Sequence, residues 1–563
     1  METIDFFQAV FFLIALVVLS IPLGAFIGNV LRGDKHLLSR PLRFLETGIY
    51  RMSGVETAAE MTWKQYALAL LLFNLVGFLF VLGLQLFQHL LPLNPAKLGP
   101  VPFWLAVNTS VSFMTNTNWQ AYAGENTLSY LTQMLGLGVH NFLSAATGIA
   151  VVAALARGLV GRSTHFIGNF WIDLVRSTIY VLLPLAVLWA ILLMGQGVLQ
   201  NFVAYVSAQT LEGVQQILPM GPVASQIAIK QLGSNGGGFF GVNSAHPFEN
   251  ATPFSNFLEM FALLLIPAAL PIAYGRLVGD KRHGLIIYLA MFILFIVVLV
   301  VAFKAEFAGN PALAGLNFLE GKEIRFGIVN SVLWGMASTV TSNGSVNAML
   351  SSFSPGAGGL ALLNMMLGEV VWGGVGSGLY GMALFILVTV FIAGLMVGRT
   401  PEYLGKKIEA GEIKLAVIGI LAPSLLILTF SAFASISELG LASLGNKGPH
   451  GLSEILYAFT STTQNNGSAF GGLNANTAFF NITTSITMLV GRFIVLIPVL
   501  AIAGRLASKK FTPPSSGSFP TNGGSFLILL CSTLVIVGAL TFFPALCLGP
   551  IMEHFLMLAG RFF

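Results

Sequence analysis

Ten separate stretches of this 563-residue chain are each long and apolar enough to cross a lipid bilayer. A spanning helix needs about 20 mostly apolar residues. The stretches are 5–30, 65–92, 127–157, 170–195, 252–276, 284–304, 357–398, 413–437, 477–504 and 525–548. Only 9% of the residues are charged, against about 25% in a soluble domain. The chain is therefore predicted to be an all-α polytopic membrane protein with ten transmembrane helices, and a soluble enzyme, a disordered chain and a secreted disulfide scaffold are excluded.

Basic residues are concentrated in alternate connectors between these stretches. Of the 27 Lys and Arg residues, 18 lie in the connectors that follow odd-numbered spans, although the other connectors are longer. Because loops rich in Lys and Arg stay on the cytoplasmic side, the odd connectors are predicted to be cytoplasmic and both termini extracytoplasmic. The net charge of +5 is explained by this bias and by anionic lipid, so nucleic acid is not expected as a partner.

The connectors after spans 2, 4, 6 and 8 share a semi-apolar stretch, too short to cross a bilayer, that ends in a short polar tract. The stretches are 103–118, 222–236, 326–344 and 451–467, and their ends are spaced by 118, 108 and 123 residues. One such tract alone is more typical of an extracytoplasmic loop, but four in register indicate a repeated helix–pore-loop–helix unit. The predicted repeats are 65–157, 170–276, 284–398 and 413–504, with extra N- and C-terminal spans in 1–30 and 525–563.

A loop that enters the membrane and returns must line a polar cavity, because lipid cannot satisfy non-helical backbone. Four loops converging on a central pore would present backbone carbonyls that replace the hydration shell of a cation, as in a potassium channel. Gly236, Gly344 and Gly467 are expected in left-handed backbone, and so is Asn118 in the first repeat. The four tracts contain no Asp or Glu, which favours a monovalent cation.

Several segments resemble the potassium-binding A subunit family (KdpA) of the Kdp potassium-transporting ATPase. They are NTNWQAYAGE (116–125), QLGSNGGGFFGVNSAHPFENATPFSN (231–256), STVTSNGSVNAM (338–349), LGEVVWGGVGSGLYGM (367–382) and STTQNNGSAFGGLNANT (461–477). The resemblance extends from the first span to the last and implies membership in the superfamily of Trk, Ktr and HKT potassium transporters. It also implies that the chain binds extracellular K⁺, the transported ion, and passes it to a P-type ATPase catalytic subunit (KdpB-like). A third, single-span subunit (KdpC-like) and a small single-span peptide (KdpF-like) would complete this high-affinity uptake complex in the bacterial plasma membrane.

The same resemblance assigns a selectivity filter to three residues in each tract. These are Asn116, Thr117, Asn118, Ser234, Asn235, Gly236, Ser342, Asn343, Gly344, Asn465, Asn466 and Gly467. Gln120 matches a position tied to potassium affinity. Glu249, a little beyond the second tract, could draw cations toward the mouth of the pore, and the alternative is that it is a solvated loop charge.

The seventh stretch is too long for one spanning helix. Its 42 residues would form a helix of roughly 63 Å, about twice the thickness of the hydrocarbon core. Glycines including Gly368 and Gly373 crowd its middle, so a break at membrane depth is expected, with close helix packing as the alternative. In the superfamily, a loop at this place lies beneath the filter and directs the ion sideways.

Ionisable residues near this break are candidates for a gate or tunnel. Glu369 and Arg492 are expected to form a gate or tunnel-lining pair, and Arg399 lies at the cytoplasmic end of the seventh stretch. A purely structural ion pair is the alternative for all three residues, and snorkelling to the membrane surface would by itself explain Arg399.

The chain contains neither a Walker A motif nor the DKTGT phosphorylation motif of P-type ATPases, and its connectors are too short for a nucleotide-binding domain. It is therefore expected to be no enzyme by itself, to hold no ATP or organic cofactor, and to depend on another polypeptide for energy. A Trk- or Ktr-like channel or symporter without an ATPase partner is the alternative. A haem- or quinone-binding subunit is disfavoured because the eight His residues are scattered.

Overall fold

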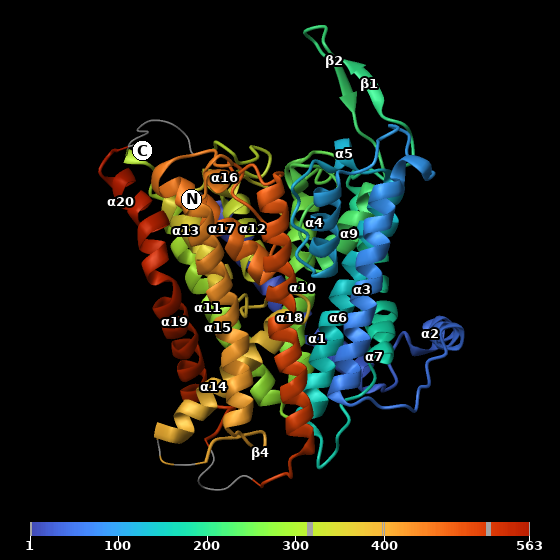
Figure 1. Ribbon diagram of the computed structural model, residues 1–563, viewed down its shortest axis with the longest axis vertical. Helices are drawn as coiled ribbons and strands as arrows, with labels where there is room; N and C mark the ends of the chain where they lie inside the picture. Colours follow the sequence, from blue (N-terminus) through green and yellow to red (C-terminus); the bar gives the residue numbers. More distant parts are fainter. Residues whose placement is uncertain (1–2, 312–318, 397, 399, 514–518, 562–563) are drawn as a thin grey trace.

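The computed structural model describes residues 3–311, 319–396, 398, 400–513 and 519–561. Its helices pack side by side in one bundle, and the first and last helices reach the same end of it (Figure 1). Ten helical segments in the described part of the chain are long and apolar enough to span a membrane, as predicted. These segments are Phe6–Arg32, Trp63–Leu90, Thr132–Val160, Phe170–Gly195, Pro253–Leu277, Lys281–Phe307, Ser377–Met396, Ala410–Ile436, Ala478–Ser508 and Gly524–Leu558.

The first half of the chain holds two units, each made of a span, a short helix and a second span. The elements of the first are α3 (Trp63–Phe87), α4 (Phe103–Met114), α5 (Gly124–Thr127), the π-helical η2 (Thr132–Gly138) and α6 (Val139–Val160). Those of the second are α7 (Phe170–Arg176), the π-helical η3 (Ser177–Leu182), α8 (Leu183–Gly195), β1 (Val206–Gln209), β2 (Gln215–Leu218), α9 (Val223–Leu232) and α10 (Pro253–Leu277). Strands β1 and β2 pair antiparallel and form a hairpin that projects from the end of the bundle (Figure 1).

The second half repeats this plan with one difference. The third unit holds α11 (Lys281–Phe307), α12 (Gly327–Val340), α13 (Pro355–Met366) and α14 (Ser377–Met396), and a short hairpin of β3 (Glu402–Tyr403) and β4 (Lys406–Lys407) follows it. The fourth holds α15 (Ala410–Ile436), α16 (Glu438–Leu441), α17 (Gly448–Gln464) and α18 (Ala478–Ser508). The seventh predicted stretch is therefore two helices, α13 and α14, separated by the non-helical residues 367–376.

Helices outside these units flank the bundle. They are α1 (Thr3–Arg32), α2 (Ser39–Ser53), α19 (Gly524–Leu546), the π-helical η7 (Cys547–Ile551) and α20 (Met552–Leu558). Gly24 of α1 faces the backbone carbonyl of Ala269 in α10 so closely that a Cβ would collide with it. Small residues at such crossings let transmembrane helices approach through their backbones, where lipid supplies no hydrophobic driving force between them.

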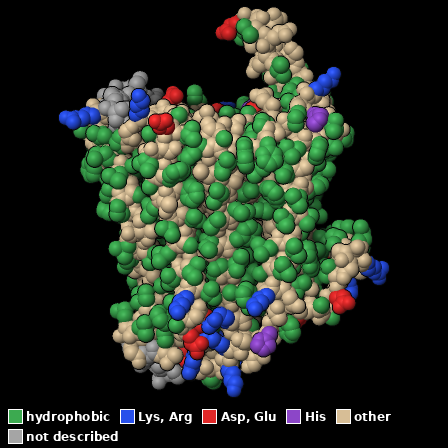
Figure 2. Space-filling model, in the orientation of Figure 1, with side chains coloured by type: hydrophobic (Ala, Val, Ile, Leu, Met, Phe, Trp, Pro, Cys, Tyr) green, Lys and Arg blue, Asp and Glu red, His purple; other side chains and the backbone are tan. Residues whose placement is uncertain are grey.

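The four short helices α4, α9, α12 and α17 lie inside the bundle and do not cross it (Figure 1). Each contacts spans of its own unit: α4 packs on α3, α9 on α8 and α10, α12 on α11, and α17 on α15 and α18. We call them the pore helices. On the face shown in Figure 2, the middle band of the molecule is almost entirely hydrophobic, and Lys and Arg gather at the end opposite the β1–β2 hairpin.

Candidate pore site

The residues that follow the four pore helices fold in the same way. In each case the helix is followed by a residue with a left-handed backbone: Asn116 (φ 64°), Ser234 (φ 49°), Ser342 (φ 53°) and Asn465 (φ 63°). The next residue then donates its N–H to the carbonyl five residues earlier. These bonds are Thr117 to Ser112 (2.9 Å), Asn235 to Lys230 (2.9 Å), Asn343 to Ser338 (3.2 Å) and Asn466 to Ser461 (2.8 Å).

A left-handed residue followed by such a six-to-one hydrogen bond is the Schellman cap, which ends helices by satisfying a free carbonyl. Asn tolerates the left-handed region better than most residues, whereas Ser is held there at a cost in free energy. The left-handed residues predicted from the sequence lie two positions further along each tract, and these caps were not predicted. Four caps of one geometry show that the four tracts, 115–118, 233–236, 341–344 and 464–467, are structurally equivalent.

The tracts meet at one point. A Cβ added at Gly236 would lie 2.9 Å from the carbonyl oxygen of Thr117, 2.9 Å from that of Asn343 and 3.2 Å from that of Asn466. These three oxygens belong to the three other repeats and occupy equivalent positions, one residue beyond the left-handed cap. Backbone oxygens from three tracts thus gather around the backbone of the fourth, and clustered carbonyls of this kind can replace the water shell of a cation.

The expected left-handed conformation holds for three of the four predicted positions. Asn118 (φ 56°), Gly344 (φ 74°) and Gly467 (φ 103°) have it, but in the second tract the left-handed residue is Gly237 (φ 69°), so the prediction for Gly236 is wrong. The sequence GGG in the second repeat allows this shift by one residue. Glycine is required at 236 for another reason, because any side chain there would enter the space between the carbonyls.

Side-chain amides hold the tracts from behind. Asn235 donates through Nδ2 to Oδ1 of Asn116 (2.7 Å) and to Oδ1 of Asn118 (2.9 Å), which ties the second tract to the first. Asn465 donates to Oγ1 of Thr117 (2.9 Å), which ties the fourth tract to the first. All of these side chains are buried. These side chains brace the tracts from behind and leave the backbone carbonyls free to face the central space.

The pore helices also set the electrostatics of this space. The C-termini of α4, α9, α12 and α17 immediately precede the four tracts. Each helix C-terminus carries a partial negative charge of roughly half an elementary charge. Four such ends directed at one region favour a cation there without any carboxylate in the tracts.

A hollow lies on the outer side of the tracts, toward the end with the β1–β2 hairpin. It encloses about 670 Å³ and is lined by residues of all four repeats, among them Gln120, Gly237, Gly344 and Gly467. Gln120 both accepts from the N–H of Gly238 (2.9 Å) and donates to its carbonyl (2.8 Å). This side chain therefore fixes the backbone of the second repeat just above the tract.

Glu249 is neither at the mouth of the pore nor a solvated loop charge, so both interpretations of it are wrong. Its side chain is fully buried and pairs with Lys230 of α9, whose Nζ lies 2.5 Å from Oε1. Lys230 also donates to the carbonyl of Gly237 (3.0 Å), so the ion pair supports the second tract from behind. A Lys in a short helix at membrane depth requires a buried partner, and that signal in the sequence could have identified the pair.

The non-helical segment 367–376 lies beneath the tracts. Glu369 accepts hydrogen bonds from the hydroxyl of Ser342 and from Nδ2 of Asn466 (2.8 Å), so its buried carboxylate touches the third and fourth tracts. Val375 and Gly376 lie so close to Gly148 of α6 that no Cβ would fit between the two backbones. The segment thus extends from the fourth tract to the inner helix of the first repeat, across the floor of the pore.

The expected pair of Glu369 and Arg492 does not form an ion pair in the described part of the chain. Arg492 of α18 is buried and lies near enough to Glu369 and Tyr380 to interact with them only through its electrostatic field. The carboxylate is instead satisfied by Ser342 and Asn466, which hold it up against the tracts. Arg399 lies outside the described residues.

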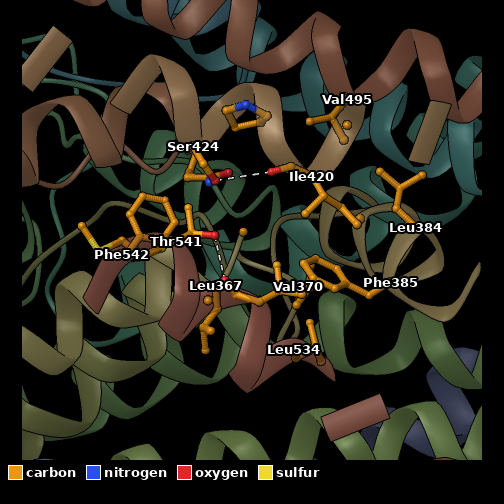
Figure 3. A pocket seen from close by; sticks show the side chains of 18 residues that line it. Leu367, Val370, Leu384, Phe385, Ile420, Ser424, Val495, Leu534, Thr541 and Phe542 are labelled. Carbon is orange, nitrogen blue, oxygen red and sulfur yellow. Dashed lines mark hydrogen bonds between the residues drawn. The ribbon is translucent and has the colours of Figure 1, made fainter. Parts of the chain in front are cut away.

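A small cavity opens sideways from this floor. It encloses about 40 Å³, enough for a few water molecules, and lies between the non-helical segment, α14, α15, α18 and α19. Figure 3 shows that Leu367, Val370, Phe385 and Phe542 make its wall largely apolar. Gly368 also lines it, whereas the backbone of Gly373 is packed against Glu369 and Gly378.

Together, the pore helices, the equivalent tracts and the interrupted helix define a four-repeat, potassium-channel-like membrane transport protein. The potassium transporter TrkH from Vibrio parahaemolyticus has a similar fold, with a TM-score of 0.51 and 14% sequence identity over 86% of this chain and 96% of that chain. The family model of the potassium-transporting ATPase A subunit matches residues 10–555, so the chain belongs to this family.

Relatives from several bacteria agree with this assignment. The potassium-transporting ATPase potassium-binding subunit of Rhodospirillum centenum is 58% identical, over 96% of this chain and 96% of its own. The proteins of the same name from Sorangium cellulosum and Leptospira interrogans are 54% and 56% identical, over 97% and 91% of this chain and 98% and 92% of their own. The resemblance seen in the sequence motifs is thereby confirmed.

Proposed function

We propose that this chain binds K⁺ at the point where the four tracts meet and serves as the potassium-binding subunit of an ATP-driven uptake complex. The observation that carries this proposal is the cluster of carbonyls of Thr117, Asn343 and Asn466 around the position of a Gly236 side chain. The relatives are named as potassium-binding subunits of a potassium-transporting ATPase, which supports the choice of ion. The filter comprises the three residues proposed from each tract, and Gln120 keeps the second tract in place.

We further propose that the segment 367–376 blocks straight passage and that K⁺ leaves sideways. Glu369 attracts the ion to the floor, and the positive charge of Arg492 prevents it from continuing toward the far side. The cavity next to Gly368 and Phe385 is the start of the sideways route. It lies against α19, so this face is where we place the ATPase partner (KdpB-like).

The complex would also contain the third and the small single-span subunits (KdpC-like and KdpF-like). The membrane is the bacterial plasma membrane, with the filter and both termini on the extracytoplasmic side. This orientation is supported by the Lys and Arg residues at the end opposite the β1–β2 hairpin (Figure 2). We assign the repeats to 65–157, 170–276, 284–398 and 413–504.

The test is Gly236→Ala, because its methyl group would lie among the carbonyls. The matched control is Gly83→Ala in α3, where an added Cβ meets nothing within 4 Å. We expect the K⁺ concentration for half-maximal ATPase activity of the purified complex to rise about 100-fold in Gly236→Ala and to stay unchanged in the control. A hundredfold change corresponds to about 2.7 kcal/mol of binding free energy. Unchanged K⁺ dependence in Gly236→Ala would refute the proposal.

A further inference from the structure

We propose that the groove between α2 and the bundle binds the phosphate headgroup of an anionic phospholipid. The groove encloses about 1110 Å³ and is bordered by α2, the end of α1 and the start of the fourth span, with Arg40, Arg43, Arg51 and Tyr180 in its lining. It lies far from the tracts and from the cavity beneath them, so it plays no part in the proposed ion path.

The position of α2 is that of a helix lying in a membrane surface. In Figure 1 it is seen nearly end-on beside the lower part of α3 and α7, so its axis runs across the bundle. It belongs to the end of the molecule where basic side chains gather (Figure 2). An amphipathic helix in this place and orientation lies at the boundary between headgroups and acyl chains.

One side of α2 carries apolar side chains that the protein covers only in part, since Leu42 and Leu45 pack against the core while Met52 does not. Ile49 is 40% exposed and Met52 91%, and Leu37 just before the helix is 87% exposed. Phe44, which is 69% exposed, lies at the border with the basic face, seven residues before Arg51. Large apolar side chains that face outward at the level of a bilayer surface insert among acyl chains. The apolar side of α2 therefore fixes the depth of the helix at the level of the phosphates.

The other side of α2 is basic. Arg40, Arg43, Thr47 and Arg51 follow one another at spacings of three and four residues, which places them on one face of the helix. This face borders the groove, and Lys35 contributes a further charge from the preceding turn. None of the four cations has an ion-pair partner among the described residues, which leaves them free to bind phosphate oxygens.

The acidic residues of the groove are mostly neutralised already. Asp34 pairs with Arg32 (2.9 Å), and Glu46 pairs with Arg176 (2.9 Å) and accepts a hydrogen bond from Tyr180 (2.6 Å). Glu56 is the one remaining carboxylate in the lining. The groove therefore has an excess of positive charge, and the Glu46 contacts attach α2 to the bundle without consuming that excess.

A phospholipid can contact the apolar side of α2 through its acyl chains and bind the basic side through its phosphate. A free phosphate ion can bind only the basic side. The test compares lipid binding by the purified complex in nanodiscs of phosphatidylcholine that contain a small fraction of phosphatidylglycerol. Native mass spectrometry after release into detergent measures how much phosphatidylglycerol each variant retains. The variants are Arg40→Gln/Arg43→Gln, the charge-conserving Arg40→Lys/Arg43→Lys, and the matched control Lys281→Gln/Arg282→Gln, which removes two exposed charges from the start of α11.

We expect the Gln pair to bind phosphatidylglycerol about 30-fold more weakly, from the loss of two charges next to an anionic headgroup. The Lys pair and the α11 control should bind it within a few-fold of the wild type. Equal retention by the Gln pair would overturn the proposal. So would displacement of the lipid by millimolar inorganic phosphate, which would indicate a free-anion site.

A photo-cross-linker at position 52 gives a measurement that does not depend on the arginines. We expect adducts with phospholipid, because Met52 is 91% exposed on the apolar side of α2. A cross-link to another polypeptide of the complex would overturn the proposal, since a protein partner would then cover this face.

Discussion

The second repeat supports its tract with charges buried behind it, whereas the third repeat places a carboxylate directly beneath its tract. In the second, Lys230 and Glu249 form a closed pair next to an inner helix, α10, that runs unbroken. In the third, the inner helix is interrupted and Glu369 contacts two tracts. The caps of the two tracts are nevertheless alike. The four repeats are thus equivalent in the tracts, where we propose that the ion binds, and differ beneath them, where we propose that its path is decided.

The largest effect should come from breaking the ion pair of the second repeat. Lys230→Met leaves Glu249 buried without its cationic partner, which typically costs about 3–5 kcal/mol. Because Lys230 also holds the carbonyl of Gly237, K⁺ affinity should fall together with stability. The free energy of unfolding and K⁺-dependent activity of the purified complex measure the two effects.

The double variant Lys230→Met/Glu249→Met is the control for this prediction. It removes both charges, so most of the lost stability should return, whereas the support of the Gly237 carbonyl stays absent. If the double variant were as unstable as the single one, the pair would not act as a unit.

A smaller effect is expected from the carboxylate of the third repeat. Glu369→Gln keeps the shape but replaces one of the two oxygens that accept hydrogen bonds from Ser342 and Asn466 with an NH2 group. A buried donor left without its acceptor costs about 1–3 kcal/mol, so K⁺ affinity should fall about 30-fold. Titration of K⁺-dependent ATPase activity measures this change.

Glu259 of the second repeat provides the matched comparison. It is a fully buried carboxyl group that accepts hydrogen bonds from Ser244 (2.7 Å) and Gln231 (3.0 Å). It accepts no hydrogen bond from a residue of the four tracts. Glu259→Gln should therefore change K⁺ affinity by less than about threefold. Equal losses in the two variants would mean that the position of Glu369 beneath the tracts has no special role.

The smallest effect is a pH dependence of stability that arises where His246 of the second repeat meets Arg325 of the third. Burial, helped by the positive charge of Arg325 from the third repeat, lowers the pKa of His246 in the second to about 4. In the unfolded chain this His takes up its proton near pH 6.5, whereas in the folded protein it stays neutral down to about pH 4. The free energy of unfolding therefore keeps its full value above pH 6.5 and declines as the pH falls from 6.5 toward 4. Thermal unfolding between pH 8 and pH 4.5 should show this decline, and His246→Asn should reduce it. A slope unchanged in the variant would assign the titration to other groups.

The sequence predicted the parts of the fold that depend on hydrophobicity and on repetition. Ten spans follow from apolar length, and the tracts follow from their recurrence in register. The interruption at 367–376 was predictable because a 42-residue apolar stretch exceeds the thickness of the membrane.

The sequence could not predict which side chains of different repeats contact one another. Glu369 contacts Ser342 and Asn466 rather than Arg492, because the non-helical segment carries its carboxylate up to the tracts. Glycine composition likewise could not decide between Gly236 and Gly237 for the left-handed position, since both accept it. Such choices are made by the tertiary contacts of each residue, which a single sequence does not record.

The most direct test of K⁺ binding between the four tracts is to locate the bound ion. Rb⁺ resembles K⁺ and scatters X-rays anomalously, so diffraction from crystals of the complex grown in Rb⁺ would mark its position. If K⁺ binds between the tracts, an anomalous peak is expected within coordination distance of the backbone oxygens of Thr117, Asn343 and Asn466. Rb⁺ peaks found only elsewhere in the chain, with none among these oxygens, would contradict this binding site.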